Sequence, residues 1–327
     1  MARRAIGSAS ILSRNLRPSK GTTGFPDERS ITEHLRRIAV IPPSSQVVVG
    51  IGDDCAVYRP EGSAEDLLFT TDLFIEGVHF LPETHSAADI ARKALARGLS
   101  DIAAMGGAAR ICLVSLCVPR WSDDEWLRLF FAELVSDASR AGAVLAGGDL
   151  SHADTLACDI VVCGGVPQGR SFLRSGARPG DQIWVSGTLG GSAMGLETGQ
   201  GAAWERHLNP QPRLALASHL QFGESRPTAA IDISDGLSLD LHRLCSASGV
   251  AAEITDPPQF PGATLAQALH GGEEYELMFT MPPGHSLPFQ FQGLPLTPIG
   301  IIQEGPPGRI LHNGRLVEPL GYDHFRN

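Results

Sequence analysis

The chain has 327 residues, of which 43% are hydrophobic and 19% charged, a composition typical of a globular protein large enough for two domains. Its net charge of −10 and pI of about 5.5 give no electrostatic footprint for nucleic-acid binding. No apolar stretch approaches the roughly 20 residues that a membrane-spanning helix needs. The sequence therefore predicts neither a nucleic-acid partner nor a membrane partner.

The first 27 residues differ from the rest of the chain. Five basic residues precede the first acidic one: Arg3, Arg4, Arg14, Arg17 and Lys20. A targeting segment is one interpretation, but only Ile11 and Leu12 interrupt a polar stretch where an apolar core would be required. We expect residues 1–27 to be a disordered basic extension or the product of an upstream start.

Alternating helix and strand patterns follow. In the first half they predict helices at 30–38, 87–105 and 122–141. The first begins with a Ser30–Glu33 capping box, the second has Ser86 as its N-cap, and the third begins with Ser122 and Glu125. Strands are predicted at 47–51, 67–71, 111–118, 144–146 and 156–163. In the second half they predict a strand at 182–186, helices at 190–197 and 212–221, a strand at 230–231, a helix ending near 248, and strands at 250–254, 275–280 and 297–302. The alternation favours an α/β or α+β fold.

A loop rich in glycine, arginine and proline, residues 170–181, separates the two halves. We expect an N-terminal domain at 28–167 and a C-terminal domain at 168–327. The six cysteines form no C-x-x-C pair, so small buried side chains in a reducing cytoplasm are the favoured interpretation over a metal site or disulfides.

Acidic residues recur at five places beside apolar or glycine-rich stretches. They are Asp53 with Asp54, Asp72, Asp101, Asp149, and Asp232 with Asp235. A buried carboxylate is costly unless a cation neutralises it, and two carboxylates about 5 Å apart repel by roughly 3 kcal/mol at an effective dielectric near 20. Carboxylate oxygens select Mg²⁺ or Ca²⁺, and Mg²⁺ held by few carboxylates usually acts with substrate phosphates. The clusters therefore predict a site for several Mg²⁺ ions and a nucleotide.

Each acidic position also has an ordinary explanation when taken alone. Asp53 is typical of an Asx-turn, Asp72 of a strand end, and Asp101 of a solvated helix face. Their recurrence at expected strand ends favours a shared site, because ligand sites in open sheets gather at the carboxyl ends of strands.

Common nucleotide-binding motifs are absent. The only lysines are Lys20 and Lys93, neither of which follows a glycine, so a P-loop is excluded. No G-x-G-x-x-G follows a predicted strand either. His79 and Arg174 remain ambiguous between structural and anion-binding roles, although the guanidinium fork of Arg174 matches phosphate geometry. Any ATP site must use another scaffold.

Nine motifs occur in one order over nearly all of the chain from about residue 30. They are GIGDDCAVY, TTDLFIEGVHF, KAL…LSDIAAMGG, GGDLS, GRSFLRSGARPGD, VSGTLGG, AIDISDGLSLDL, GGEEYEL and GYDHF. Together they resemble the thiamine-monophosphate kinase family. The resemblance implies a two-domain, α/β (α+β type) fold like that of aminoimidazole ribonucleotide synthetase. Its β-rich N-terminal domain would bind ATP and Mg²⁺ and dimerise through a shared β-barrel, and its C-terminal domain would be α/β.

The resemblance also implies an activity. ATP would donate its γ-phosphoryl group to thiamine monophosphate, giving thiamine diphosphate, in a cytoplasmic homodimer. The acceptor oxygen is already ionised at pH 7, so no residue is assigned as a general base, and positioning and charge neutralisation carry the reaction. We expect direct in-line transfer assisted by Asp54, Asp72, Asp101 and Asp235.

The residues that match the family's binding positions fall into three groups. Those matching Mg²⁺ ligands are Asp54, Thr70, Thr71, Asp72, Asp101, Asp149, Asp232 and Asp235. Those matching ATP contacts are Gly148, Asp149, Arg174 and Ser234, and those matching substrate contacts are His79, Glu273 and Tyr322.

Three departures from the family pattern bear on ion or nucleotide affinity. Leu150 replaces a usual Thr, Glu274 a usual Asp, and Arg97-Gly98 a usual Val-Asn. A glycine in a helix interior costs about 1 kcal/mol relative to alanine. The carboxylate set itself is intact.

Other activities of the same superfamily are the first alternative. Selenophosphate synthetase would need an early reactive cysteine and lysine, and the hydrogenase maturation factor a C-terminal cysteine, and neither pattern is present. Aminoimidazole ribonucleotide synthetase is excluded by no single residue. The second alternative is a non-catalytic nucleotide-binding regulator, which would bind ATP without turnover.

Overall fold

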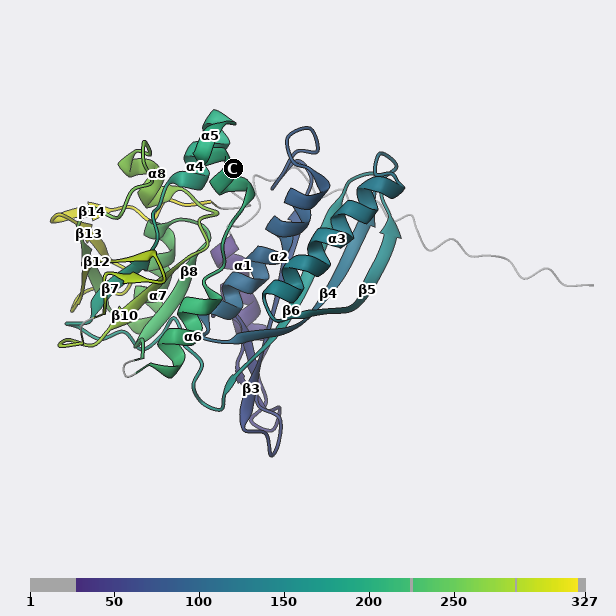
Figure 1. Cartoon of the computed structure of the whole chain (residues 1–327). Coiled ribbons are helices and arrows are strands. Elements are labelled where there is room, and N and C mark those ends of the chain that lie inside the picture. The colour runs from purple at the N-terminus through teal and green to yellow at the C-terminus, as the bar shows by residue number, and fades with distance from the viewer. Residues whose placement is uncertain (1–27, 224–225, 286, 323–327) are drawn as a thin grey trace, which may run out of the picture.

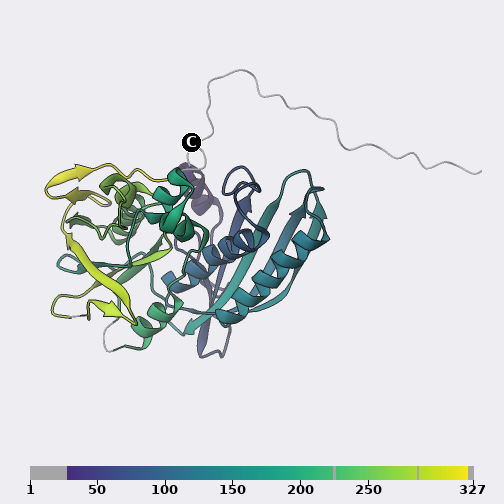
Figure 2. The same ribbon diagram turned by 45° about the horizontal axis from the view of Figure 1, so that its top comes forward.

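The computed structural model describes residues 28–223, 226–285 and 287–322, so the predicted basic extension at 1–27 lies outside the described residues. The fold is mixed α/β, as predicted. Two β-sheets, one from each half of the chain, lie next to each other, and helices pack between and around them (Figures 1 and 2).

The N-terminal sheet has six strands in the order β1-β2-β3-β6-β4-β5. They are β1 (Val47–Val49), β2 (Ala56–Tyr58), β3 (Glu65–Ile75), β4 (Ala108–Val118), β5 (Val144–His152) and β6 (Ala157–Pro167). Neighbours are antiparallel except β4 and β5, which are parallel. The helices of this half are α1 (Glu28–Ile38), α2 (Ala87–Ala104) and α3 (Asp124–Arg140), of which α2 and α3 cover one face of the sheet (Figure 1).

The C-terminal sheet has the order β14-β13-β9-β12-β7-β10-β8, with β11 paired to β12. Its strands are β7 (Gln182–Ser186), β8 (Ala229–Ile233), β9 (Ala251–Ile254), β10 (Glu276–Met281), β11 (Gln290–Phe291), β12 (Leu294–Gln303), β13 (Ile310–His312) and β14 (Arg315–Val317). Its helices are α4 (Gly191–Thr198), α5 (Gly201–Leu208), α6 (Leu214–Phe222), α7 (Leu237–Ser248) and α8 (Leu265–His270). The domain boundary predicted at 167/168 falls between β6 and β7.

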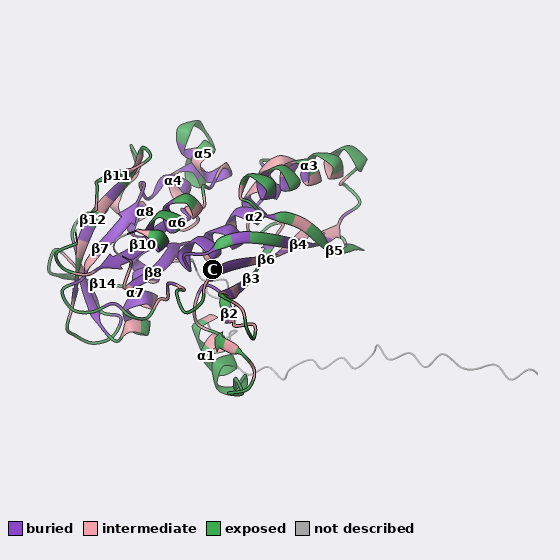
Figure 3. Cartoon of the chain, turned by 60° about the horizontal axis from the view of Figure 1, so that its bottom comes forward, coloured by how far each residue is buried: buried purple, intermediate pink, exposed green. Residues whose placement is uncertain are grey.

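Helix α2 joins the two halves. Ser86 and Asp89 form the predicted capping box at its start, and most of its eighteen residues are buried (Figure 3). Ile90 and Leu95 pack in the N-terminal core, whereas Ala104 packs with Trp184 in a core cluster of the C-terminal half. A helix that contributes to both cores fixes the two sheets relative to each other, so residues on α2 can serve a site between them.

Two predicted helix starts are wrong. Helix α1 begins at Glu28, so Ser30 lies within its first turn rather than at its N-cap. Helix α3 is capped by Asp123, whose carboxylate accepts the Trp126 N–H at 2.8 Å, and not by Ser122. The capping-box pattern of Ser122 and Glu125 predicted the wrong residue, because the adjacent Asp123 is an equally favourable N-cap residue.

Two strands extend beyond their predicted ends. β3 continues through Asp72 to Ile75 because it pairs residue by residue with β6, from Glu65↔Pro167 to Ile75↔Ala157. β5 continues through the glycine pair, which stays in parallel register with β4. Asp72 and Asp149 therefore lie within strands, not after them. The sequence also missed the short elements β2, α5, α8, β11, β13 and β14.

The two faces of the N-terminal sheet differ sharply. Alternate residues such as Leu68 and Phe74 are buried beneath α2 and α3. We call the opposite surface the outer face. Its large apolar side chains are each at least 39% exposed: Phe69, Leu73, Ile111, Leu113 and Val144. All six cysteines are free thiols, and within the described residues no helix is both long and apolar enough to span a membrane.

Gly148 provides a test of the β4–β5 pairing. A Cβ atom built on Gly148 would lie 1.8 Å from the Val114 carbonyl oxygen, whereas one on Gly147 meets nothing closer than Leu113 at 3.7 Å. Both glycines have positive φ, +152° and +155°. We expect Gly148→Ala to lower the free energy of unfolding by about 3 kcal/mol more than Gly147→Ala does. Only the methyl group at position 148 would collide with the backbone of β4 and push the two strands apart. Urea unfolding measures this, and equal losses would contradict the register.

Candidate functional site

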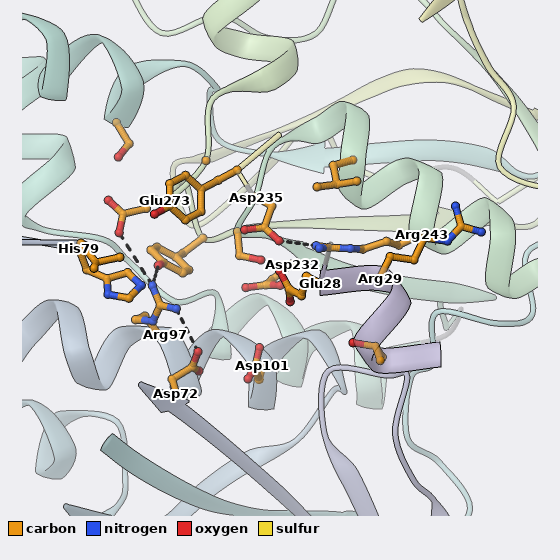
Figure 4. A pocket seen from close by; sticks show the side chains of 18 of the residues that line it. Glu28, Arg29, Asp72, His79, Arg97, Asp101, Asp232, Asp235, Arg243 and Glu273 are labelled. Carbon is orange, nitrogen blue, oxygen red and sulfur yellow. Dashed lines mark hydrogen bonds and ion pairs between the residues drawn. The ribbon is translucent and has the colours of Figure 1, made fainter. Parts of the chain in front are cut away.

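A pocket of about 1270 Å³ opens between the two halves. Its lining comes from α1, β3 and α2 of the N-terminal half and from α7 and the loops beside β8 and β10 of the C-terminal half (Figure 4). Predicted site residues at its surface are Asp72, His79, Asp101, Arg174, Asp232, Ser234, Asp235, Glu273 and Tyr322. Most of the predicted residues thus converge on one cavity.

Three carboxylates form the core of the site. Asp54 follows β1, Asp101 lies near the end of α2, and Asp232 is the penultimate residue of β8. One oxygen from each lies within 4.8 Å of the others. We call these three residues the carboxylate cluster. The Ser100 hydroxyl donates to Asp232 Oδ2 at 2.6 Å, and the Thr70 hydroxyl donates to Asp101 Oδ2.

Burial of this cluster has a clear electrostatic cost. Burial and the neighbouring Asp72 raise the pKa of Asp101 well above its usual range, and burial and Asp54 do the same for Asp232. Arg174 Nη2 donates to Asp54 Oδ1 at 2.6 Å, but the buried Asp54 Oδ2 has no hydrogen-bond partner. An unsatisfied buried carboxylate oxygen beside two further carboxylates fits a hard divalent cation such as Mg²⁺.

Asp72 lies beside the cluster and is paired with a residue of α2. Arg97 Nη2 approaches Asp72 Oδ1 at 3.3 Å, and Arg97 Nη1 donates to the Tyr275 hydroxyl at 3.3 Å. Arg97 Nη1 also lies 3.9 Å from Glu273 Oε1. Figure 4 shows Arg97 between Asp72 and Glu273.

The turn that carries Ser234 and Asp235 is held by a carboxylate. Asp240 Oδ2 accepts the backbone N–H groups of Ser234, Asp235 and Gly236 at 3.0–3.1 Å. Arg243 Nη1 donates to Asp235 Oδ2 at 2.5 Å and to Asp240 Oδ1 at 2.8 Å. Asp235 therefore faces the pocket already paired with an arginine.

The far end of the pocket holds Glu273. Lys93 Nζ donates to Glu273 Oε2 at 3.0 Å and to the His207 carbonyl at 3.0 Å. Burial would raise the pKa of Glu273, but Lys93, His207 and Arg97 together lower it to about 2. Glu273 is therefore ionised at neutral pH and supplies one fixed negative charge.

Aromatic side chains surround that end. His79 Nδ1 accepts the Ile75 N–H at 3.0 Å, and its ring stacks on Phe74 with centroids 5.3 Å apart. Tyr322 lines the pocket, and its backbone N–H donates to the Asp235 carbonyl at 3.2 Å.

Five predicted site residues are not among those that line the pocket. Asp54 and Thr70 are hydrogen-bonded to the lining residues Arg174 and Asp101, whereas the other three lie away from it. Thr71 lies on the outer face, where its hydroxyl donates to Asp159 Oδ1 at 2.5 Å. Gly148 and Asp149 lie on the edge strand β5, where they are exposed and paired in register with Val114 and Ser115 of β4. Within one copy of the chain, these three residues are separate from the carboxylate cluster.

Sequence analysis missed several residues that organise the site. Lys93, Arg97 and Asp101 are spaced four residues apart, which places them along one face of α2. That spacing was the available signal for Lys93 and Arg97. Asp240 and Arg243 are likewise three apart on α7, yet nothing in the sequence distinguished them from a solvated ion pair.

The three departures have structural accounts. Gly98 packs against β6, because a Cβ there would lie 2.8 Å from Val162 Cγ2. Glu274 is buried, with its Oε1 accepting the Ser192 N–H at 2.9 Å and Arg206 Nη2 at 3.4 Å from its Oε2. Leu150 is exposed on β5. None of the three replaces a member of the carboxylate cluster.

Comparison with known proteins connects this geometry to a family. The family model described as AIR synthase related protein, N-terminal domain, matches residues 52–167. The thiamine-monophosphate kinase of Salmonella typhimurium is 38% identical over 309 residues, covering 85% of this chain and 92% of the relative. That of Bacillus subtilis is 34% identical over 312 residues, covering 86% and 95%.

A solved structure agrees over nearly the same span. AaThiL complexed with AMPPCP and TMP matches with a TM-score of 0.79 and 31% identity, covering 91% of this chain and 97% of that one. The predicted fold class is therefore confirmed.

Asp232→Asn tests whether the carboxylate cluster holds a cation. Without Mg²⁺ we expect the variant to melt at or above the wild-type temperature, since one of three repelling carboxylates is removed while the amide oxygen still accepts from Ser100. Mg²⁺ should stabilise the wild type, by about 2.7 kcal/mol at one hundred times its dissociation constant, and leave the variant unchanged.

The control for this melting experiment is Asp256→Asn, an exposed acid paired with His312 outside the pocket, which should keep the full Mg²⁺ response. A wild type that does not respond to Mg²⁺, or an Asp232→Asn variant that responds equally, would rule out a cation held by the cluster.

Proposed function

Because this chain belongs to the thiamine-monophosphate kinase family, we propose that it transfers the γ-phosphoryl group of ATP to thiamine monophosphate, giving thiamine diphosphate. As a member of that family it is an enzyme, a phosphotransferase whose acceptor is a phosphate group. The observation that carries the proposal is the arrangement of one pocket, with the carboxylate cluster at one end and the ionised Glu273 among aromatic rings at the other.

The two ends suit the two parts of the acceptor. Thiamine monophosphate carries a cationic aromatic ring and a phosphate. Glu273, which is ionised, supplies the negative charge that an aromatic cation needs, and the ring of His79, backed by the buried Phe74, lines the same pocket. The phosphate would then point toward the carboxylate cluster, where ATP is to be held. We propose Tyr322 as a third contact to the acceptor.

The donor would bind across the opposite side of the pocket. Arg174 offers a guanidinium fork next to Asp54, and Ser234 lies in the turn whose backbone is fixed by Asp240. We propose both as ATP contacts. Gly148 and Asp149 lie outside this pocket, so we propose that they contact ATP only from a second copy of the chain. Asp54, Asp101 and Asp232, with Thr70, Asp72 and Asp235 beside them, are the residues that would hold Mg²⁺. When bound, Mg²⁺ would neutralise the charge of the ATP triphosphate and of the acceptor phosphate.

The chain's own residues then have a positioning role. The acceptor phosphate oxygen needs no base, so direct in-line transfer depends on holding donor and acceptor in line. Ser100 and Thr70 keep the carboxylates of Asp232 and Asp101 fixed by hydrogen bonds. The free thiols fit a reducing cytoplasm, which we propose as the location of the reaction.

Incubation with Mg-ATP and thiamine monophosphate, followed by direct detection of thiamine diphosphate, tests this function. We expect product from the wild type and at least about a 100-fold lower kcat from Asp54→Asn, which removes one carboxylate charge from the site. Asp256→Asn should retain full activity, since it lies outside the pocket.

Two results would contradict the proposal. ATP binding without any turnover would favour a non-catalytic regulator. ATP turnover without thiamine diphosphate would favour a sister enzyme, with aminoimidazole ribonucleotide synthesis the next assay. A trapped phospho-aspartate or phospho-histidine would replace direct transfer by a two-step route.

We also propose that two copies of the chain pair through the outer face. Five large apolar side chains lie exposed on this one face of the sheet, and exposed apolar surface gathered on one face is typical of a protein–protein contact. Thr71 and Asp149 lie on the same outer face. We therefore propose that any metal they bind is held where the two copies meet.

Leu113→Asp should convert a wild-type dimer to a monomer in sedimentation velocity at micromolar concentration, because it places a charge within the apolar outer face. Leu316→Asp, equally apolar and exposed but on β14 of the C-terminal sheet, should leave the dimer intact. A monomeric wild type would contradict the pairing.

A further inference from the structure

Arg97 is the cation nearest the middle of the pocket. It extends from α2 between the carboxylate cluster on one side and Glu273 on the other (Figure 4). Its guanidinium lies 5.9 Å from the centre of the Phe74 ring. The side chain is only 17% exposed, so it is held within the site rather than extending into solvent.

The hydrogen-bonding capacity of Arg97 is largely unused. A guanidinium has five N–H donors, and those of Arg97 make two long bonds of 3.3 Å, to Asp72 and to the Tyr275 hydroxyl. Its buried Nε has no acceptor. The structure therefore presents a nearly buried cation whose fork is incompletely satisfied, and such a group favours an anion that accepts two bonds at once.

The surroundings restrict what that anion is. A carboxylate of the chain is already present on each side, Asp72 and Glu273, and neither forms a bidentate pair with Arg97. Arg97 lines the pocket between Asp72 and Glu273, so the unused N–H groups of its Nη1 and Nη2 are near a ligand bound there. An anion bound there must belong to the molecule that occupies the aromatic end. It must also face the Mg²⁺ ions that we propose for the carboxylate cluster. A phosphate monoester on an aromatic cation meets both conditions.

We propose that Arg97 binds the phosphate of the acceptor and thereby orients it, with the cationic ring toward Glu273 and the phosphate toward the carboxylate cluster. This inference rests on the proposed kinase function and adds a specificity-determining residue to it. Arg97 makes the site select a phosphorylated acceptor over the free alcohol, because the alcohol leaves the guanidinium without its anion.

A second consequence concerns Asp72. When the guanidinium turns toward a phosphate, its 3.3 Å contact with Asp72 is exchanged for the new bonds. Asp72 is then released to face the carboxylate cluster. Binding of the acceptor phosphate and of a cation at Asp72 are therefore coupled, each favouring the other.

Titration calorimetry with two ligands tests the proposal. Thiamine monophosphate and thiamine are titrated into wild type, Arg97→Gln, Arg97→Lys and Arg92→Gln, with Mg²⁺ present and ATP absent. Arg97→Gln should weaken thiamine monophosphate by about 10- to 100-fold, the equivalent of a charge-assisted pair, toward the affinity of thiamine. Its affinity for thiamine should stay within about twofold of the wild type.

Two variants on the same helix serve as controls. Arg97→Lys, which keeps the charge but not the fork, should fall between wild type and Arg97→Gln. Arg92→Gln lies on α2 but bonds to Asp89 and Glu133 away from the pocket, so it should leave both affinities unchanged.

The outcomes separate this inference from the proposed function. Equal losses of both ligands in Arg97→Gln would mean that Arg97 only supports Tyr275 and Glu273, and would overturn the inference. An unchanged preference for thiamine monophosphate would overturn it as well. Failure of the wild type to bind thiamine monophosphate would instead overturn the proposed function, and the inference with it.

Discussion

Mutual repulsion among buried carboxylates is the constraint on which this molecule depends. Asp54, Asp101 and Asp232 come from three elements of both halves, and their oxygens lie within 4.8 Å of one another. Hydrogen bonds from Ser100 and Thr70 and one ion pair from Arg174 to Asp54 offset only part of that repulsion. The folded chain therefore carries an electrostatic cost that the cation proposed for this site would remove.

Helix α2 makes that arrangement possible. A strand would expose alternate residues to opposite faces, but a helix repeats one face about every four residues, so Lys93, Arg97 and Asp101 lie along one face of α2. Arg97 and Asp101 line the pocket, and Lys93 is buried next to it. The three charged side chains have different roles. Lys93 fixes Glu273, Arg97 spans the middle, and Asp101 joins the cluster. Because the same helix is packed into both cores, the distance between the two ends of the pocket is set by its rise rather than by a flexible hinge.

Sequence was sufficient for features that depend on local pattern. The capping box of α2, the strand at 182–186 and the acidic residues of the pocket all follow from residue type and spacing. Sequence was insufficient where the end of a strand or the partner of a side chain depends on residues far away in the chain. β3 reads as ending at Asp72, yet its ladder with β6 carries it to Ile75. The pairing of Arg97 with Asp72 and Tyr275 joins residues 25 and 178 positions away, which no local pattern encodes.

The strand through Thr70, Thr71 and Asp72 shows why one motif can serve two surfaces. Successive side chains alternate across a sheet, so Thr70 and Asp72 reach the pocket side, while Thr71 reaches the outer face and bonds to Asp159. Asp159 is in register with Ser115, and Ser115 with Asp149, so a second polar row crosses the outer face of the same sheet. Three consecutive residues cannot all face one cavity of a single copy. In the pairing of two copies proposed above, the inner residues would serve the pocket and the outer row would lie at the contact between the copies.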